Sequence, residues 1–177
     1  NKKLIVVVAG SLGSSTVNEK MADFLAKVKD QDYQVLYITG KNLYDKFISD
    51  HKFPDNVKVL PYLDDLPALL KNTDLIITRA GASTMSEIIS LTLPAIFIPS
   101  PYVANNHQYY NALELKNNNA GELIEEKDLT SKILLKKINE ILFDSQKYQE
   151  IKTNLGKMSM NNSSEVIYNK LKDLIKW

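Results

Sequence analysis

Two patterns of apolar residues alternate along the chain. Short continuous runs, the first at residues 4–9, are typical of strands buried on both faces of a parallel sheet. Between them lie segments in which apolar residues recur every three or four positions, the spacing of a helix with one buried face. The continuous runs predict six strands, at residues 4–9, 34–39, 57–60, 75–78, 95–98 and, more weakly, 122–124.

Helices are predicted between the strands. The first starts after Thr16, which has Glu19 three residues further on, the spacing of a capping box. Others are expected at residues 42–49, 66–70, 83–91 and 107–116, and the last part of the chain predicts only helices, at residues 131–143, 146–157 and 164–175. Strands that alternate with helices imply right-handed crossovers. The predicted fold class is α/β: one domain, residues 1–177, with a Rossmann-like doubly wound parallel six-stranded sheet and a helical C-terminal tail.

The composition of the chain excludes several classes of function. The chain has 177 residues, of which 44% are apolar and 24% charged, as in an ordinary globular domain. A net charge of +1 argues against binding nucleic acid through its phosphate backbone. The absence of cysteine excludes disulfides and thiolate metal sites, and His51 and His107 are the only histidines. No apolar run reaches the roughly 18 residues that a membrane-spanning helix needs.

Two small-residue loops follow predicted strands. Residues 10–14 read GSLGS and residues 80–84 read AGAST, and each leads into a helix. Ligands of open α/β sheets bind beyond the carboxyl ends of the strands, where the N–H groups of a helix start attract anions. Two such starts suit a diphosphate, although either loop could be no more than a tight turn. The GxxG spacing of Gly10 and Gly13 is not the GxGxxG of a nicotinamide dinucleotide site.

Two charged residues flank the second loop. Arg79 is the only arginine of the chain, and its planar guanidinium could bind a phosphate, pair with an acid or end a strand. Glu87, one turn inside the following helix, could accept hydrogen bonds from both hydroxyls of a ribose. Glu87 also has the capping-box spacing from Thr84, so a purely structural role stays open.

Two further segments lie at strand ends. Residues 100–108, SPYVANNHQ, form a polar loop with amide and imidazole groups of the kind that contact sugar hydroxyls, although Asn105 or Asn106 could instead cap the next helix. Tyr62 offers a flat face to a base, and Asp64 could cap the helix after it. No Ser–His–Asp set is present. The pattern indicates a site that binds a nucleotide-sugar.

The order of the motifs AGSLGS, YLDDL, TRAGASTMSE and IPSPYVANNHQYYNA resembles the carboxyl-terminal domain of the MurG family. These bacterial glycosyltransferases add N-acetylglucosamine to the lipid-linked muramoyl-pentapeptide of peptidoglycan synthesis. The resemblance covers residues 4–130 and, more loosely, the helical tail. It implies the C-terminal, donor-binding lobe of a GT-B fold. The chain starts close to its first strand and without methionine, so we expect it to be part of a longer polypeptide whose amino-terminal acceptor lobe is absent here.

The resemblance also assigns parts of the donor to individual residues. The positions that it implies are Ser11, Gly13, Ala82, Ser83 and Thr84 for the diphosphate; Tyr62 and Leu63 for uracil; Glu87 for the ribose; His107, Gln108 and Asn111 for the N-acetylglucosamine; and Arg79 for the turn or the diphosphate side. No catalytic residue, metal or cofactor is implied in this chain, because the base is expected in the acceptor lobe.

The implied function is the UDP-N-acetylglucosamine-binding half of an inverting N-acetylglucosaminyltransferase that converts lipid I to lipid II. The implied partners are the UDP-N-acetylglucosamine donor, a lipid-linked acceptor through the other lobe, and a membrane surface, with no nucleic acid. The implied location is peripheral, at the cytoplasmic face of the plasma membrane. We expect the isolated chain to bind UDP-sugar and to transfer nothing. Two alternatives stay open: a stand-alone donor-binding subunit of a split transferase, and a fragment of another UDP-sugar enzyme such as an epimerase.

Overall fold

The computed structural model describes residues 2–8, 14–159 and 163–175, and its centre is a parallel sheet. The strand order is β3-β2-β1-β4-β5-β6. The strands are β1 (Lys3–Val8), β2 (Tyr33–Ile38), β3 (Val57–Leu60), β4 (Leu75–Thr78), β5 (Ala95–Phe97) and β6 (Glu122–Leu123). The order reverses between β1 and β4, which is the switch point where doubly wound sheets bind their ligands.

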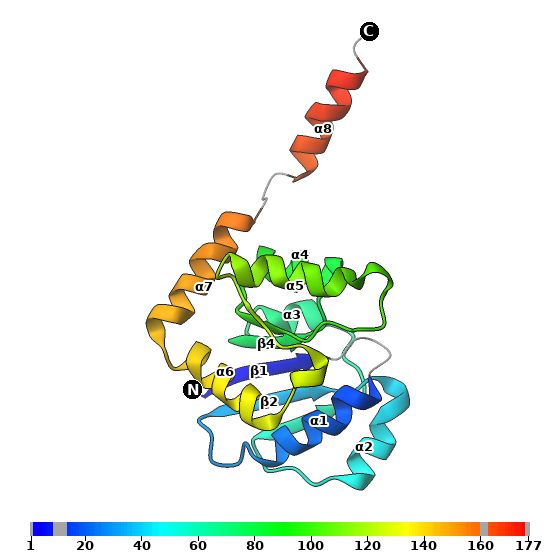
Figure 1. Ribbon diagram of the computed structural model, residues 1–177, viewed down its shortest axis with the longest axis vertical. Helices are drawn as coiled ribbons and strands as arrows, with labels where there is room; N and C mark the ends of the chain where they lie inside the picture. The colour runs from blue at the N-terminus through cyan, green and yellow to red at the C-terminus, as the bar shows by residue number, and fades with distance from the viewer. Residues whose placement is uncertain (1, 9–13, 160–162, 176–177) are drawn as a thin grey trace.

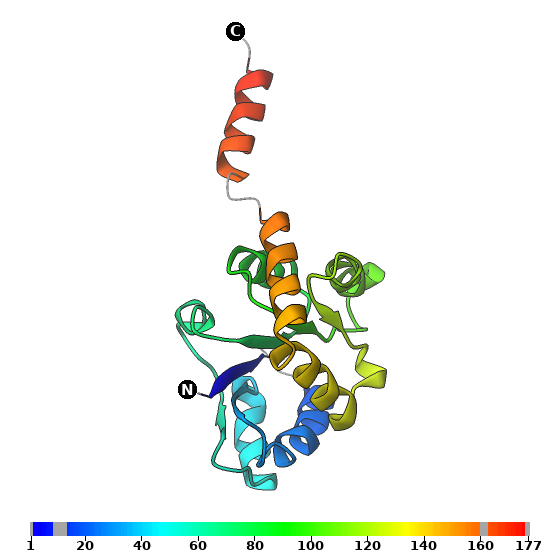
Figure 2. The ribbon, with the colours of Figure 1, turned by 90° about the vertical axis from the view of Figure 1, so that its left-hand side faces the viewer.

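Helices cover both faces of the sheet (Figure 1). They are α1 (Ser15–Ala26), α2 (Tyr44–Asp50), α3 (Leu66–Leu70), α4 (Ala82–Ser90), α5 (His107–Asn117), α6 (Ser131–Leu142), α7 (Ser145–Met158) and α8 (Ser163–Leu174), with 3-10 turns η1 (Lys41–Leu43), η2 (Ala104–Asn106) and η3 (Glu126–Asp128). Helices α3, α4 and α5 lie on one face and α1 and α2 on the other, with α6 beside α1 and α7 against α4 (Figure 2). Helix α8 extends away from the rest.

The central strands form the core because both of their faces are covered. In β1, Ile5, Val6 and Val7 are at most 1% exposed. Ile5 lies in register with Val35 of β2 on one side and Leu75 of β4 on the other, and Leu75 is fully buried. Continuous apolar runs are therefore needed in these strands, as the sequence predicted.

The predicted α/β fold class is confirmed. Each predicted strand and helix is present, and the ends that the sequence predicted agree with the structure to within two residues. The six-stranded parallel sheet and the helical tail are likewise as expected.

The predicted helix starts need correction. The capping box at Thr16 is wrong, because α1 is capped by Ser14, whose Oγ accepts a hydrogen bond from the N–H of Val17 at 3.4 Å. The capping box between Thr84 and Glu87 is also wrong, because α4 starts two residues before Thr84 and follows an N-cap glycine.

Two other caps also differ in detail. Helix α3 is capped by Asp65 rather than Asp64, through the N–H of Ala68 at 3.1 Å. Asn106 precedes α5 as predicted, but in a left-handed conformation and without a capping hydrogen bond from its side chain.

Candidate functional site

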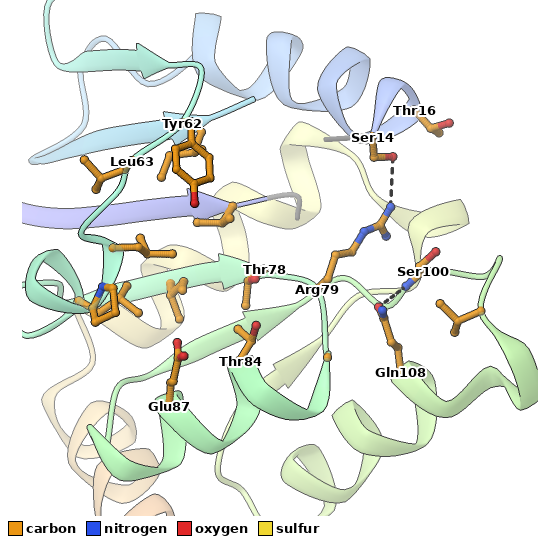
Figure 3. Close-up of a pocket in the computed structure, with 18 of the residues that line it drawn as sticks. Ser14, Thr16, Tyr62, Leu63, Thr78, Arg79, Thr84, Glu87, Ser100 and Gln108 are labelled. Atoms are coloured by element: carbon orange, nitrogen blue, oxygen red, sulfur yellow. Dashed lines mark hydrogen bonds between the residues drawn. The ribbon is translucent and has the colours of Figure 1, made fainter. Parts of the chain in front are cut away.

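A cavity of about 960 Å³ opens at the carboxyl edge of the sheet. It lies at the switch point, where Val8 ends β1 and Thr78 ends β4, and the first turns of α1 and α4 border it. Its volume is within the range of sites that enclose a small organic ligand. Figure 3 shows that the labelled residues, which line it, come from several separate elements.

One end of this cavity is apolar. Tyr62 and Leu63 follow β3, and their neighbours along the wall come from α3, namely Leu66, Pro67 and Leu70. Lys41 Nζ lies 4.5 Å from the centre of the Tyr62 ring, so a cation helps to hold the aromatic ring in place. This end offers an aromatic and aliphatic surface to a flat group.

The opposite end is polar (Figure 3). It is formed by the start of α1, the residue after β4, the loop before α5 and the start of α5, through Ser14, Ser15, Thr16, Arg79, Ser100 and Gln108. Gln108 Oε1 accepts a hydrogen bond from the N–H of Ser100 at 2.9 Å, which holds both ends of the loop between them. Hydroxyls and the first backbone N–H groups of a helix suit an anionic group here.

Glu87 lies on α4 together with Thr84, and both side chains face the cavity (Figure 3). The Glu87 side chain is exposed, and within the part of the chain that the structure describes its carboxylate has neither a hydrogen bond nor an ion pair. Because a capping role is excluded by the start of α4, this carboxylate is available to hydroxyl groups of a ligand.

Arg79 is held by the protein itself. One terminal nitrogen donates to the carbonyl of Ile98 at 3.0 Å, and the other donates to Ser14 Oγ at 3.1 Å. The latter nitrogen also lies 2.6 Å from Oε2 of Glu126, and the Arg79 and Glu126 side chains are only 13% and 6% exposed. Of the roles that the sequence left open, pairing with an acid is the one observed. Sequence reasoning missed Glu126, because a glutamate in the charged stretch EEKD gives no sign of burial.

Comparison with known proteins identifies the family. Residues 4–167 match the model of the glycosyltransferase family 28 C-terminal domain. The chain belongs to this family. The predicted resemblance to MurG proteins and the predicted C-terminal GT-B lobe are both confirmed.

Relatives of this family 28 domain are longer proteins. The chain is 36% identical to a UDP-N-acetylglucosamine--N-acetylmuramyl-(pentapeptide) pyrophosphoryl-undecaprenol N-acetylglucosamine transferase of Bacillus cytotoxicus, over 99% of this chain and 49% of the relative. The crystal structure of Acinetobacter baumannii MurG has the same fold, with a TM-score of 0.84 and 24% identity over 98% of this chain and 50% of that one. The crystal structure of the glycosyltransferase VinC in complex with dTDP is also similar in fold, with a TM-score of 0.71 and 20% identity over 90% of this chain and 37% of that one. The chain thus spans about half the length of the curated relatives it matches.

The structure brings half of the predicted binding residues of the family 28 domain together. The residues that line the cavity are Tyr62, Leu63, Arg79, Thr84, Glu87 and Gln108. Ala82 and Ser83 lie in the first turn of α4 next to the lining, with exposed side chains. Ser11 and Gly13 lie outside the described residues.

Two predicted sugar contacts of the family 28 domain do not line the cavity. His107 is exposed, and its Nδ1 lies 2.9 Å from the carbonyl of Ala104. Asn111 donates a hydrogen bond to the carbonyl of Ala80 at 3.1 Å and so supports the turn before α4.

The described residues of the family 28 domain also bear on membrane insertion and metal binding. No helix in this part of the chain is both long and apolar enough to cross a membrane. Within residues 2–8, 14–159 and 163–175, no group of three or more metal-binding side chains occurs.

Proposed function

We propose that this chain binds the UDP-N-acetylglucosamine donor of an N-acetylglucosaminyltransferase that acts on a lipid-linked muramoyl-pentapeptide. The observation that carries the proposal is the cavity at the switch point, which has an apolar aromatic end, a polar end and the available Glu87 carboxylate on its wall. The name of the Bacillus cytotoxicus relative describes a transferase of N-acetylglucosamine from its UDP donor.

The parts of the cavity suit the parts of this donor in order. Uracil would lie on the apolar wall near Tyr62 and Leu63. The ribose would place its two hydroxyls at Glu87, a carboxylate that can accept both hydrogen bonds. The diphosphate would then reach the starts of α1 and α4, where unpaired N–H groups and the helix dipoles favour negative charge. The sugar would point toward the loop that Ser100 and Gln108 hold.

The chemistry assigned to this chain is binding and stabilisation of charge. The 4-hydroxyl oxygen of the acceptor would form a bond to the anomeric carbon, while the bond from that carbon to the diphosphate oxygen breaks and the configuration inverts. The hydroxyl proton would pass to a base outside this chain. Helix starts at the diphosphate would stabilise the negative charge that develops on the leaving UDP.

The acceptor site and the base are proposed to lie in the half of the relatives' length that this chain does not span. Contact with the membrane, at the cytoplasmic face of the plasma membrane, is proposed to come from that part too. The chain alone should therefore bind donor and catalyse no transfer.

Calorimetric titration of the wild-type chain and of Glu87→Ala with UDP, UDP-N-acetylglucosamine, UDP-glucose and 2′-deoxy-UDP tests the donor assignment. Because a hydrogen bond to a charged group contributes about 1.5–3 kcal/mol, Glu87→Ala should weaken UDP binding about tenfold or more. Removing the 2′-hydroxyl should weaken binding to the wild type but not to Glu87→Ala, since its partner is then already gone.

Glu114→Ala is the matched control, because Glu114 is an exposed glutamate on α5 outside the cavity. It should leave the binding of every nucleotide unchanged. The proposal fails if neither this chain nor the full-length protein binds UDP. Equal sensitivity of wild type and Glu87→Ala to the 2′-hydroxyl would remove the ribose assignment.

A further inference from the structure

The buried pair of Arg79 and Glu126 separates two cavities. Arg79 lines the large cavity, whereas Glu126 lines a second cavity of about 400 Å³ between the start of α1, the loop before α5 and η3. Thr16 and Tyr102 border both cavities. The ion pair is therefore part of the wall at the polar end of the proposed donor site.

This pair connects four parts of the fold. Arg79 directly follows β4, its hydrogen-bond acceptor Ile98 directly follows β5, and Glu126 comes soon after β6. The same guanidinium donates to Ser14, the N-cap of α1 (Figure 3). The ends of three neighbouring strands and the start of one helix thus meet at one side chain.

Helix α1 has a second connection to Glu126. Lys20, six residues after Ser14 along α1, donates from Nζ to the backbone carbonyl of Glu126 at 2.5 Å. The first two turns of α1 are therefore fixed to Glu126 through two independent contacts, one through Arg79 and Ser14 and the other through Lys20. Loss of the Glu126 carboxylate would remove the first contact and leave the second.

We infer that Arg79 and Glu126 are positioning residues: the pair holds the first turn of α1 against the ends of β4 and β5, and Arg79 does not itself bind the ligand's phosphates. The identity of the ligand rests on the proposed function. Because Glu126 neutralises Arg79 at 2.6 Å, the pair as a whole offers little net charge to a diphosphate. Lysine would not replace Arg79, because only the planar guanidinium fork can reach Ile98, Ser14 and Glu126 together.

The variant Glu126→Gln distinguishes a role of Arg79 in positioning α1 from direct binding of phosphate by Arg79. If the pair positions α1, this variant should weaken UDP binding about tenfold, because the guanidinium loses the buried charge that holds it, and leave the binding of uridine unchanged. If Arg79 were a phosphate ligand, its release from Glu126 would leave UDP binding unchanged or make it tighter. Either of those results, or an equal loss of UDP and uridine binding, would overturn the inference.

Glu125→Gln is the matched control. Glu125 is the neighbouring residue, and it pairs with the largely exposed Lys127 at 3.1 Å on the surface. Its substitution should change the binding of neither UDP nor uridine.

Amide hydrogen exchange without nucleotide tests the positioning step separately. The N–H of Val17 donates to Ser14 Oγ and that of Asn18 to the Ser14 carbonyl at 2.8 Å. Glu126→Gln should raise the exchange rates of both amides about tenfold, because a local opening that costs 1.4 kcal/mol less is tenfold more populated. Amides of β1 should keep their rates. Unchanged rates at Val17 and Asn18 would overturn the inference even if the wild type bound no UDP and the proposed function failed.

Ser14→Ala provides a milder variant in case Glu126→Gln does not fold. It removes the hydroxyl that Arg79 contacts and keeps the buried ion pair. The expected result is again a loss of UDP binding with uridine binding preserved. Retention of full UDP affinity in a folded Ser14→Ala variant would count against positioning through the start of α1.

Discussion

At the scale of single residues, some residues of the sequence motifs do not line the cavity, and one of them supports the backbone beside it. Asn111 uses its amide on the carbonyl of Ala80, a fully buried residue directly before the N-cap of α4. His107 is exposed at the start of α5, after Asn105 and Asn106, which both adopt positive φ values of 53° and 51°. Asparagine tolerates this conformation, but a sequence does not show which asparagine adopts it.

Asn111→Ala should lower the free energy of unfolding by about 1–3 kcal/mol, because the buried carbonyl of Ala80 loses this donor. Urea unfolding of the chain measures the change. Asn117→Ala, at the exposed end of the same helix, is the control and should stay within about 0.5 kcal/mol of the wild type. Equal stabilities of the two variants would show that the Asn111 contact contributes nothing.

At the scale of helices and strands, the periodicity of apolar residues predicted the elements but not the helix starts. Each of the two loops that precede α1 and α4 offers several adjacent residues with capping propensity, in the stretches GSST and AGAST. Their capping propensities are similar, so local preference does not decide which of them becomes the N-cap. The N-cap of α1 is Ser14 and that of α4 is Gly81, so Thr84 and Glu87 have no capping role.

Thr84→Ala should therefore change the free energy of unfolding by less than about 0.5 kcal/mol, since Thr84 is inside α4 and caps nothing. Thr130→Ala is the matched comparison, because the Thr130 side chain caps α6 through the N–H of Ile133 at 3.2 Å. Its loss should cost about 1 kcal/mol. Thermal unfolding of both variants distinguishes them, and a Thr84→Ala loss as large as that of Thr130→Ala would restore the capping-box interpretation.

At the scale of the whole molecule, a charged cluster joins the helical tail to the sheet. Glu122, the first residue of β6, accepts hydrogen bonds from Lys137 of α6 at 2.8 Å and from Lys147 of α7 at 2.6 Å. The sequence predicted each of these elements. It did not predict that Glu122 contacts two lysines that lie 15 and 25 positions further along the chain. Such contacts depend on how the helices cross the sheet, which periodicity along the chain does not encode.

This cluster should make stability depend on pH. Burial raises the pKa of the Glu122 carboxyl, but the hydrogen bonds and charges of Lys137 and Lys147 lower it more, so that its pKa in the folded chain is below the ordinary value. A carboxyl with a lowered folded pKa stabilises the fold fully above its unfolded pKa of about 4.3, and this contribution is lost as the pH falls through the folded pKa.

Urea unfolding of the wild type and Glu122→Gln between neutral and acid pH measures this contribution. The variant should be less stable near neutral pH, and the difference should shrink as the pH falls below about 4, because protonated Glu122 resembles glutamine. Glu114→Gln, at an exposed site on α5, should track the wild type across the whole range. A difference between wild type and Glu122→Gln that stays constant with pH would mean that packing, rather than the charge of the cluster, holds α6 and α7 to the sheet.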